Sequence, residues 1–270
     1  MCLIAWSWQP RQSRCLLLGA NRDEWLARPA RPMHWWEAAP GTPPVLAGRD
    51  LQGGGTWLGI RRDGLLAALT NVREAGSRPA QQPSRGNLAA RFLQGLHPQQ
   101  PQPWPVAGVQ AWAHELQRHM HDYAGFNLLL ADLRRGEMVC VSNRAPIVDV
   151  EPGVHGLSNA ALDTPWPKVQ RLKQAVAQAG SDDGEDLESL LARLRDPTPA
   201  EDSRLPALPA GMQLSPQWNR GLSAAFIRLP DYGTRCSTLL RAHADGRIHV
   251  IEQLHEADHA RREFRWNWRD

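Results

Sequence analysis

Hydrophobic residues occur along the chain in short runs that are separated by turns, and most of these runs have the length of a β-strand. Cys2–Trp8 and Arg14–Ala20 flank a polar turn, a pattern that predicts a β-hairpin. The polar residues Asn21–Glu24 mark the predicted end of the second strand. Further strands are predicted at His34–Trp36, Thr56–Ile60, Leu65–Asn71, Phe126–Asp132, Glu137–Ser142, Val154–Ser158, Ser223–Arg228, Ser237–Ala242 and Arg247–Gln253.

Four segments have apolar residues at helical spacing, and they occur as two separate pairs. The predicted helices are Ser84–Leu96, with Ser84 as N-cap, Val106–Met120, Pro167–Gln178 and Glu185–Leu194. Strands in hairpins and helices in pairs favour antiparallel sheets covered by helices, whereas a parallel sheet needs strands and helices in alternation. We therefore expect an α+β fold in a single domain over residues 1–270, although the Pro-rich stretch 197–211 is a candidate boundary.

Composition excludes several classes of protein. The net charge of +3 comes from arginines spread along the chain, without the basic and aromatic cluster that a nucleic-acid site needs. No run reaches the roughly 18 apolar residues that span a bilayer. The first residues lack the basic and apolar regions of a secretory signal. We expect a cytoplasmic protein with no integral membrane segment and no nucleic-acid partner.

The first candidate for chemistry is Cys2. None of the four cysteines forms a C-x-x-C pair, which disfavours a zinc knuckle or a thioredoxin-like site. Methionine aminopeptidase generally removes Met1 before a residue as small as Cys. The new terminus would then carry a thiol and an α-amine, whose usual pKa values of about 8.5 and about 8 let the amine take the thiol proton. Cys2 is alternatively just a small residue after the start codon.

Several short motifs give the chain a family resemblance. They are Met1-Cys2-Leu3-Ile4, Asn21-Arg22-Asp23-Glu24, Gly54-Gly55-Thr56-Trp57-Leu58-Gly59, Leu69-Thr70-Asn71, Ser84-Arg85-Gly86 and Tyr232-Gly233-Thr234-Arg235. In order and spacing they resemble the NRDE family, whose animal members are called transport and Golgi organisation protein 2. That family is similar to the cysteine N-terminal-nucleophile hydrolases, which include bile-salt hydrolases and penicillin V acylases. The resemblance implies a four-layer αββα sandwich of antiparallel sheets.

The same resemblance implies a role for each of five residues. Cys2 matches the nucleophile, Asp23 the aspartate that holds the α-amine, and Asn71 an asparagine of the oxyanion hole. Asn159 matches a second asparagine near the nucleophile, and Arg235 an arginine beside the thiol. One position departs from the acylases, which have an arginine where this chain has Ala20. Arg22 lies next to Asp23 instead, and adjacent side chains on a strand point to opposite faces.

Other residues and motifs are assigned around this site. Arg22, Gly55 and Trp57 are expected at the substrate pocket, with Gly55 allowing a close backbone approach. Gly53–Gly55 does not match a phosphate-binding loop, which needs a following Lys and helix. His255–His259 matches H-E-x-x-H, but little chain remains to supply a third zinc ligand, so we expect no metal.

These observations predict a cysteine amidohydrolase that acts on a linear amide or a related acyl compound and requires no cofactor. The alternative is a non-catalytic carrier or trafficking protein that binds haem or another hydrophobic small molecule. No C-x-x-C-H motif is present for covalent haem, so haem would be cargo. A trafficking adaptor that acts through protein surfaces is a third reading.

Overall fold

The computed structural model describes residues 2–37, 41–76, 82–100, 102–104, 108–179, 185–255 and 260–270. By its internal contacts the chain divides into two compact units. Unit 1 comprises Met1–Ala27, Arg73–Ser77 and Pro152–Arg265, and unit 2 comprises Arg28–Val72, Arg78–Glu151 and Trp266–Asp270. The expectation of a single domain stays a prediction.

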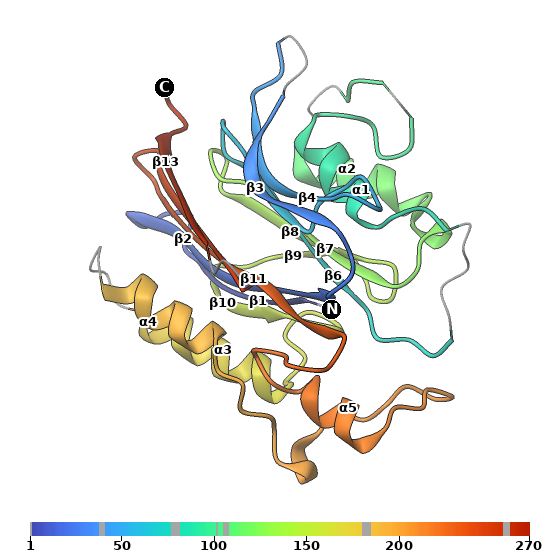
Figure 1. Ribbon diagram of the computed structural model, residues 1–270. Helices are drawn as coiled ribbons and strands as arrows, with labels where there is room; N and C mark the ends of the chain where they lie inside the picture. The colour runs from blue at the N-terminus through green and yellow to red at the C-terminus, as the bar shows by residue number, and fades with distance from the viewer. Residues whose placement is uncertain are drawn as a thin grey trace. The chain divides into compact units, whose positions relative to one another are not determined.

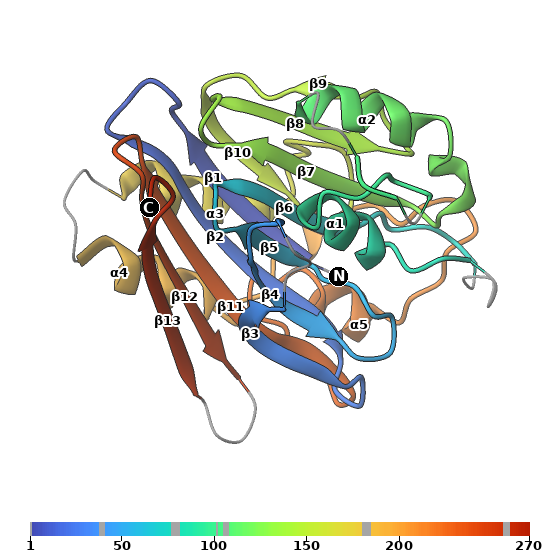
Figure 2. The same ribbon diagram turned by 90° about the horizontal axis from the view of Figure 1, so that it is seen from above.

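Unit 1 is built on a six-stranded sheet in the order β10-β1-β2-β11-β12-β13 (Figure 1). Neighbouring strands pair antiparallel wherever their register is described. The helices α3 and α4 pack on one face of this sheet (Figures 1 and 2). The elements are β1 (Cys2–Trp8), β2 (Arg14–Trp25), β10 (Gly153–Leu157), α3 (Pro167–Gln178), α4 (Glu185–Leu194), the 3-10 turn Asp202–Arg204, α5 (Pro216–Gly221), β11 (Tyr232–His243), β12 (Arg247–Leu254) and β13 (Arg261–Asn267).

Strand alternation decides which residues of unit 1 meet the helices. Leu3, Ala5 and Leu17 belong to the same buried cluster as residues of α3 and α4. The even-numbered neighbours on these strands, such as Trp6 and Leu18, are buried on the opposite face of the sheet because successive side chains point to opposite sides. Both faces of β1 and β2 are therefore covered, and this explains why their sequences are almost continuously apolar.

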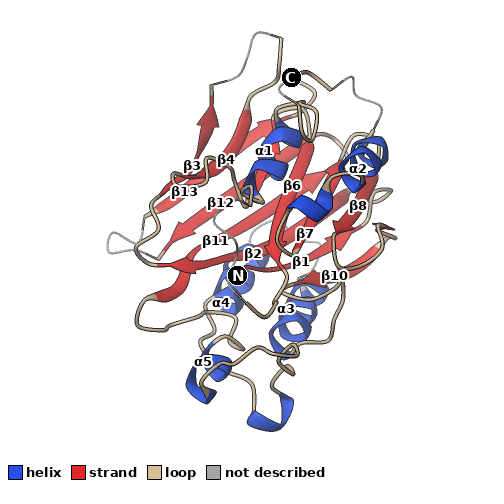
Figure 3. Ribbon diagram, turned by 90° about the vertical axis from the view of Figure 1, so that its right-hand side faces the viewer, coloured by secondary structure: helices blue, strands red, loops and turns tan. Residues whose placement is uncertain are grey.

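Unit 2 is built on a seven-stranded antiparallel sheet in the order β3-β4-β5-β6-β7-β8-β9. The helices α1 and α2 pack with strands of this sheet in one hydrophobic cluster, and Figure 3 shows them over β6 to β8. The elements are β3 (Ala30–Trp36), β4 (Val45–Asp50), β5 (Leu58–Arg61), β6 (Leu65–Asn71), α1 (Gly86–Leu93), α2 (Val109–Gln117), the 3-10 turn Met120–Asp122, β7 (Phe126–Asp132), β8 (Glu137–Ser142) and β9 (Val148–Asp149).

The predicted α+β class with antiparallel sheets and paired helices is confirmed. Several details of the prediction are wrong. Ser223–Arg228 is buried up to Ile227 but is not a strand, because its amides bond elsewhere: the backbone N–H of Phe226 donates to the carbonyl of Asp196. The N-cap of α1 is Arg85 rather than Ser84, with no side-chain capping bond. The strands β4, β9 and β13 and the helix α5 were not predicted.

No helix in the described part of the chain is both long and apolar enough to cross a bilayer.

Candidate functional site

Cys2 is the first residue of β1 and pairs with Arg22 on the neighbouring strand β2. Directly paired residues share a face of the sheet, so the thiol and the guanidinium lie on the same side. The residue is half-buried, and burial raises the pKa of its thiol. Asp23 acts in the same direction, while Arg22 and a backbone hydrogen bond from Asp23 lower the thiol pKa. Because the thiol pKa ends above its usual value, a nucleophilic Cys2 needs a base to remove its proton.

The segment Asn21–Asp23 continues β2 instead of ending it, and this corrects the predicted strand end at Ala20. Asn21 is fully buried, and its Nδ2 donates to the carbonyls of Leu194 and Ala225, at 2.8 Å each. Its Oδ1 accepts a hydrogen bond of 2.6 Å from the Ser237 hydroxyl. These contacts place Asn21 on the helix-covered face of the sheet. By alternation Asp23 shares that face and Arg22 faces the other way, as the sequence predicted.

Asp23 is 1% exposed, and β11 holds its carboxyl group. Thr234 lies opposite Asp23 in the ladder and donates a hydrogen bond of 2.6 Å to Oδ1. The phenol of Tyr232 donates to the carbonyl oxygen of the same residue at 2.8 Å. Burial raises the pKa of the Asp23 carboxyl group, while Lys168 and the Thr234 bond lower it. The carboxyl group is thus fixed in position and its charge depends on its neighbours.

Arg235 lies at a β-bulge in β11. The register shifts between Thr234, which pairs with Asp23, and Cys236, which pairs with Arg22. The Arg235 side chain is largely buried, and its Nη1 donates to the carbonyl of Trp25 at 2.9 Å. Bulges often occur next to active sites, where they redirect a side chain.

Asn159 is buried just after β10, the strand on the other side of β1. The hydroxyl of its neighbour Ser158 lies 2.9 Å from the carbonyl oxygen of Cys2 and 3.1 Å from Oδ1 of Asn159. The carbonyl of Asn159 accepts a hydrogen bond from the backbone N–H of Arg73 at 2.8 Å. Ser158 therefore connects the start of β1 to the Asn159 segment, a contact that the sequence analysis missed.

Lys168 is a second residue that the sequence analysis missed. It lies in the first turn of α3, is 1% exposed, and donates from Nζ to the carbonyl of Leu222 at 3.1 Å. Burial lowers the pKa of its ammonium group to about 8, while Asp23 and Cys2 act to raise it and Arg73 to lower it. A lysine at a buried position of an otherwise apolar helix face was the signal available in the sequence.

The other three predicted site residues belong to unit 2. Asn71 is the half-buried last residue of β6 and pairs with Phe126. A Cβ on Gly55 would lie 2.2 Å from the backbone carbon of Gly86, so Gly55 makes the close backbone approach that was predicted, and makes it to the start of α1. The Trp57 ring packs on Gly48, whose Cβ would lie 2.3 Å from the indole. The structure thus brings Cys2, Arg22, Asp23, Asn159 and Arg235 into unit 1 and leaves Asn71, Gly55 and Trp57 in unit 2.

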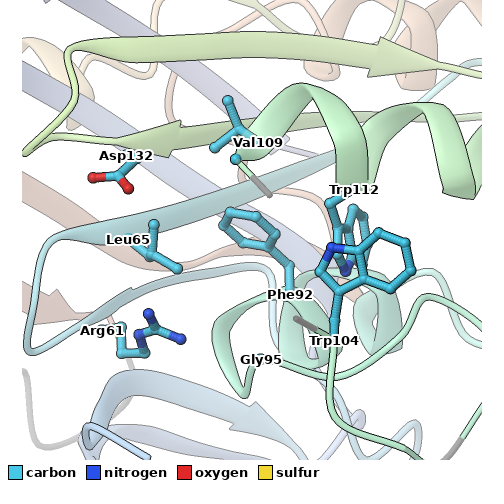
Figure 4. A pocket seen from close by; sticks show the side chains of 9 residues that line it. Arg61, Leu65, Phe92, Gly95, Trp104, Val109, Trp112 and Asp132 are labelled. Carbon is cyan, nitrogen blue, oxygen red and sulfur yellow. The ribbon is translucent and has the colours of Figure 1, made fainter. Parts of the chain in front are cut away.

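A small apolar cavity lies inside unit 2 (Figure 4). Phe92 of α1, Val109 and Trp112 of α2, and Trp104 line it, with Arg61 and Asp132 at its edge. Trp57, which was expected at a substrate pocket, is not among the residues that line this cavity. Among the described residues that line it there is no His, Cys or Met to serve as an axial ligand of haem.

The histidine of the H-E-x-x-H motif has a structural contact. Nε2 of His255 lies 2.8 Å from the hydroxyl of Ser237, and that hydroxyl donates its proton to Oδ1 of Asn21. The other residues of the motif, 256–259, lie outside the described residues. Because the serine proton goes to Asn21, His255 donates from Nε2, so this pair is not a nucleophile with its base. Within the described ranges, no group of three His, Cys, Asp or Glu residues is placed to hold a metal ion.

Comparison of the sequence with known proteins identifies the family of the chain. The family model described as "Transport and Golgi organisation 2" matches residues 1–257. The Transport and Golgi organization protein 2 homolog of Bos taurus is 35% identical, over 94% of this chain and 92% of the bovine protein. The Drosophila melanogaster protein of the same name is 24% identical, over 88% of this chain and 85% of its own length.

Among solved structures, the chain is similar to penicillin V acylase from Agrobacterium tumefaciens. The TM-score is 0.51 and the identity 12%, over 98% of this chain and 86% of the acylase. This similarity shows the fold, which is the α+β fold of the N-terminal-nucleophile hydrolases. The chain belongs to the Transport and Golgi organisation 2 family, as its motifs at Cys2, Asn21–Glu24 and Tyr232–Arg235 predicted.

Proposed function

We propose that the chain is a cysteine amidohydrolase that acts on a linear amide or a related acyl compound, with Cys2 as nucleophile. The observation that carries the proposal is the convergence of three strand segments in unit 1. Cys2 starts β1, Arg22 lies opposite it on β2 with Asp23 as the next residue, and Arg235 lies at the bulge of β11. Asn159 joins them from the segment after β10, where Ser158 bonds the Cys2 carbonyl.

The proposed reaction begins once Met1 has been removed. The free α-amine of Cys2 takes the thiol proton, and the sulfur attacks the substrate carbonyl carbon. The tetrahedral intermediate then expels the amine, which leaves with the proton from the α-amine, and a thioester remains on Cys2. Water hydrolyses the thioester, the acid product departs, and the thiol recovers its proton.

Each remaining residue has a proposed part in these steps. Asp23 orients the α-amine and stabilises its protonated form, because a nearby carboxylate favours a cation. The resemblance assigns an oxyanion-hole donor to Asn71, and the loss of such a donor in other enzymes costs about 2.7–4 kcal/mol. Arg235 favours the thiolate and Asn159 positions the Cys2 segment, while the resemblance assigns Arg22, Gly55 and Trp57 to the substrate pocket.

The alternative proposal is a non-catalytic carrier of haem or another hydrophobic small molecule. The apolar cavity lined by Trp104 and Trp112 measures about 20 Å³, which is room for about one water molecule, so a carrier would have to bind its ligand elsewhere or open this site. Either function suits the cytoplasm, since none of the four cysteines is in a disulfide and a reactive Cys2 needs a reducing compartment.

The test is a combined mass and labelling experiment on the full chain. Intact mass should show loss of Met1, and an activated acyl probe should add one acyl group that a Cys2→Ser variant does not acquire as a thioester. A Cys2 that stays unacylated on a chain without Met1, or an active chain that retains Met1, would refute the proposed chemistry. Saturable haem binding that is equal in the wild type and the Cys2→Ser variant would favour the carrier.

A further inference from the structure

Arg73 is a buried cation that has almost no partner. It follows β6 in the chain but belongs to unit 1, and it is 8% exposed. Its Nη1 donates one hydrogen bond, to Oδ1 of Asn219 at 3.3 Å. Its Nε is buried and has no hydrogen-bond acceptor among the described residues. A guanidinium has five N–H donors, so one long bond to a neutral amide leaves most of its desolvation uncompensated.

The charges near Arg73 do not make up for this loss. Among the described residues no carboxylate forms an ion pair with Arg73. Burial lowers the pKa of its guanidinium, and Tyr232 acts to raise it. Lys168 is a second buried cation, close enough that Arg73 lowers its pKa, and the carboxylate that acts on Lys168 is Asp23. The described side chains here therefore carry more buried positive than negative charge, and a bound anion would balance it.

Two contacts hold the Arg73 guanidinium in place. Its Cζ lies 4.8 Å from the centroid of the ring of Trp166, the residue before α3, which is a cation–π contact. The backbone N–H of Arg73 donates to the carbonyl of Asn159 at 2.8 Å and so ties this segment to the residues after β10. A planar guanidinium that is fixed in this way and has unused donors is suited to bind the two oxygens of a carboxylate or phosphate group.

A pocket of the size of a small molecule adjoins this cation. Asn219, the acceptor of the Arg73 bond, also lines a surface pocket of about 610 Å³ at α5, near the first turn of α3 (Figure 1). Pockets of about 300–1,000 Å³ are typical of small-molecule sites. Arg220 in the same wall already pairs with Asp202 at 3.7 Å. The apolar part of the wall is formed by Leu205, Leu214 and Pro216.

We propose that Arg73 binds the oxyanion group of a small organic acid, a carboxylate or a phosphate ester, whose apolar body lies in the pocket at α5. The oxyanion replaces the Asn219 oxygen as the acceptor. Charge-assisted hydrogen bonds of about 2.7–2.9 Å are stronger than a bond of 3.3 Å to a neutral amide. This site goes beyond the proposed hydrolase, because it binds an acid whether or not Cys2 becomes acylated.

Isothermal titration calorimetry of the full chain at pH 7 tests the site, with the ionic strength held constant by sodium chloride. We expect saturable binding of hexanoate and at least tenfold weaker binding of hexanamide, which has the same body without the charge. Hexyl phosphate is the second acid, and the tighter of the two identifies the oxyanion group. Arg73→Gln should weaken the binding of the acid by about tenfold or more. The matched control Arg11→Gln removes an exposed charge between β1 and β2 and should bind as the wild type does.

A second variant covers the case in which Arg73→Gln does not fold. In Asn219→Asp the new carboxylate pairs with Arg73 in place of the ligand, so this variant should bind hexanoate at least tenfold more weakly and unfold at a higher temperature than the wild type. Asn219→Ala removes the competing oxygen without adding a charge and should bind hexanoate at least as tightly as the wild type. Equal binding in the wild type, Arg73→Gln and Asn219→Asp overturns the proposal. So does hexanamide that binds as tightly as hexanoate, or a wild type that binds neither acid.

Discussion

Replacement of Asn21 by alanine should destabilise unit 1 by about 3–5 kcal/mol. The Nδ2 of Asn21 satisfies the carbonyl of Leu194 at the end of α4 and that of Ala225, both at 2.8 Å, and Oδ1 accepts from Ser237. Asn21 and Ser237 are both fully buried, so water cannot replace these bonds without opening the structure. Each buried partner left without a bond costs about 1–3 kcal/mol, and partial relaxation lowers the sum of three.

Urea denaturation monitored by circular dichroism measures this change in the free energy of unfolding. Asn219→Ala is the matched control, because Asn219 is half-buried and its side chain accepts a single hydrogen bond of 3.3 Å, from Arg73. We expect the control to lose less than about 1 kcal/mol. The structural role of Asn21 is refuted if Asn21→Ala is as stable as the control but is no longer acylated by an amide-type probe. Asn21 would then act in catalysis and not in stability.

Three further predictions follow from single contacts. Gly55→Ala should cost about 3 kcal/mol of stability or prevent folding, since the new Cβ would lie 2.2 Å from a backbone atom that cannot rotate away. Gly86→Ala should cost less, because the closest atom to a Cβ there is 3.1 Å away. Thermal denaturation of both variants ranks the two costs. At Asp163, burial acts to raise the pKa, but hydrogen bonds from neighbouring side chains lower it to about 2. Because the folded pKa is depressed, this stabilisation exists above the unfolded value of about 3.9 and is lost as the pH falls towards 2. Asp163→Asn should therefore lower the free energy of unfolding by about 1 kcal/mol at pH 7, after allowance for the partial exposure of the carboxyl group. In urea denaturation, the difference between variant and wild type should disappear between pH 4 and pH 2. A difference that persists at pH 2 contradicts the lowered pKa of Asp163. Thr234→Val removes the donor to Asp23 and should raise the carboxyl pKa, measurable by NMR titration, with about 1–2 kcal/mol of destabilisation; an unchanged pKa would contradict the bond.

The sequence predicted the regular parts of the fold because local pattern decides them. Cys2–Trp8, Leu65–Asn71 and Pro167–Gln178 have the bounds that their hydrophobic periodicity indicated. The pattern failed where polar residues are buried by partners distant in sequence. The sequence predicts a strand end at Asn21 because a polar residue is not expected in the core. Its hydrogen-bond partners, Ser237 and the last residue of α4, are more than 170 residues away in the chain.

The residues proposed for the site came from the family motifs, and the residue patterns alone do not show which of them lie close together. Cys2, Asp23 and Arg235 are far apart in the chain, and only the pairing of β1, β2 and β11 brings them together. Lys168 was missed because an amphipathic helix normally places lysine in solvent. Its position on the same face of α3 as Leu172 and Val176 was the local sign that it could be enclosed, and the tertiary structure shows that it is.

The bulge at Arg235 gives β11 one residue more than its pairing with β2 requires. Thr234 and Cys236 pair with the adjacent residues Asp23 and Arg22, as in an uninterrupted ladder from which a single position has been looped out. A chain that lacks Arg235 could restore an uninterrupted ladder between β2 and β11, but it would lose the carbonyl that accepts a hydrogen bond of 3.0 Å from the backbone N–H of His255. Comparison of this deletion with a substitution that removes only the guanidinium would separate the two roles of Arg235. A loss of stability in the deletion alone indicates a role in the sheet, whereas a loss of Cys2 reactivity in both indicates a role of the charge.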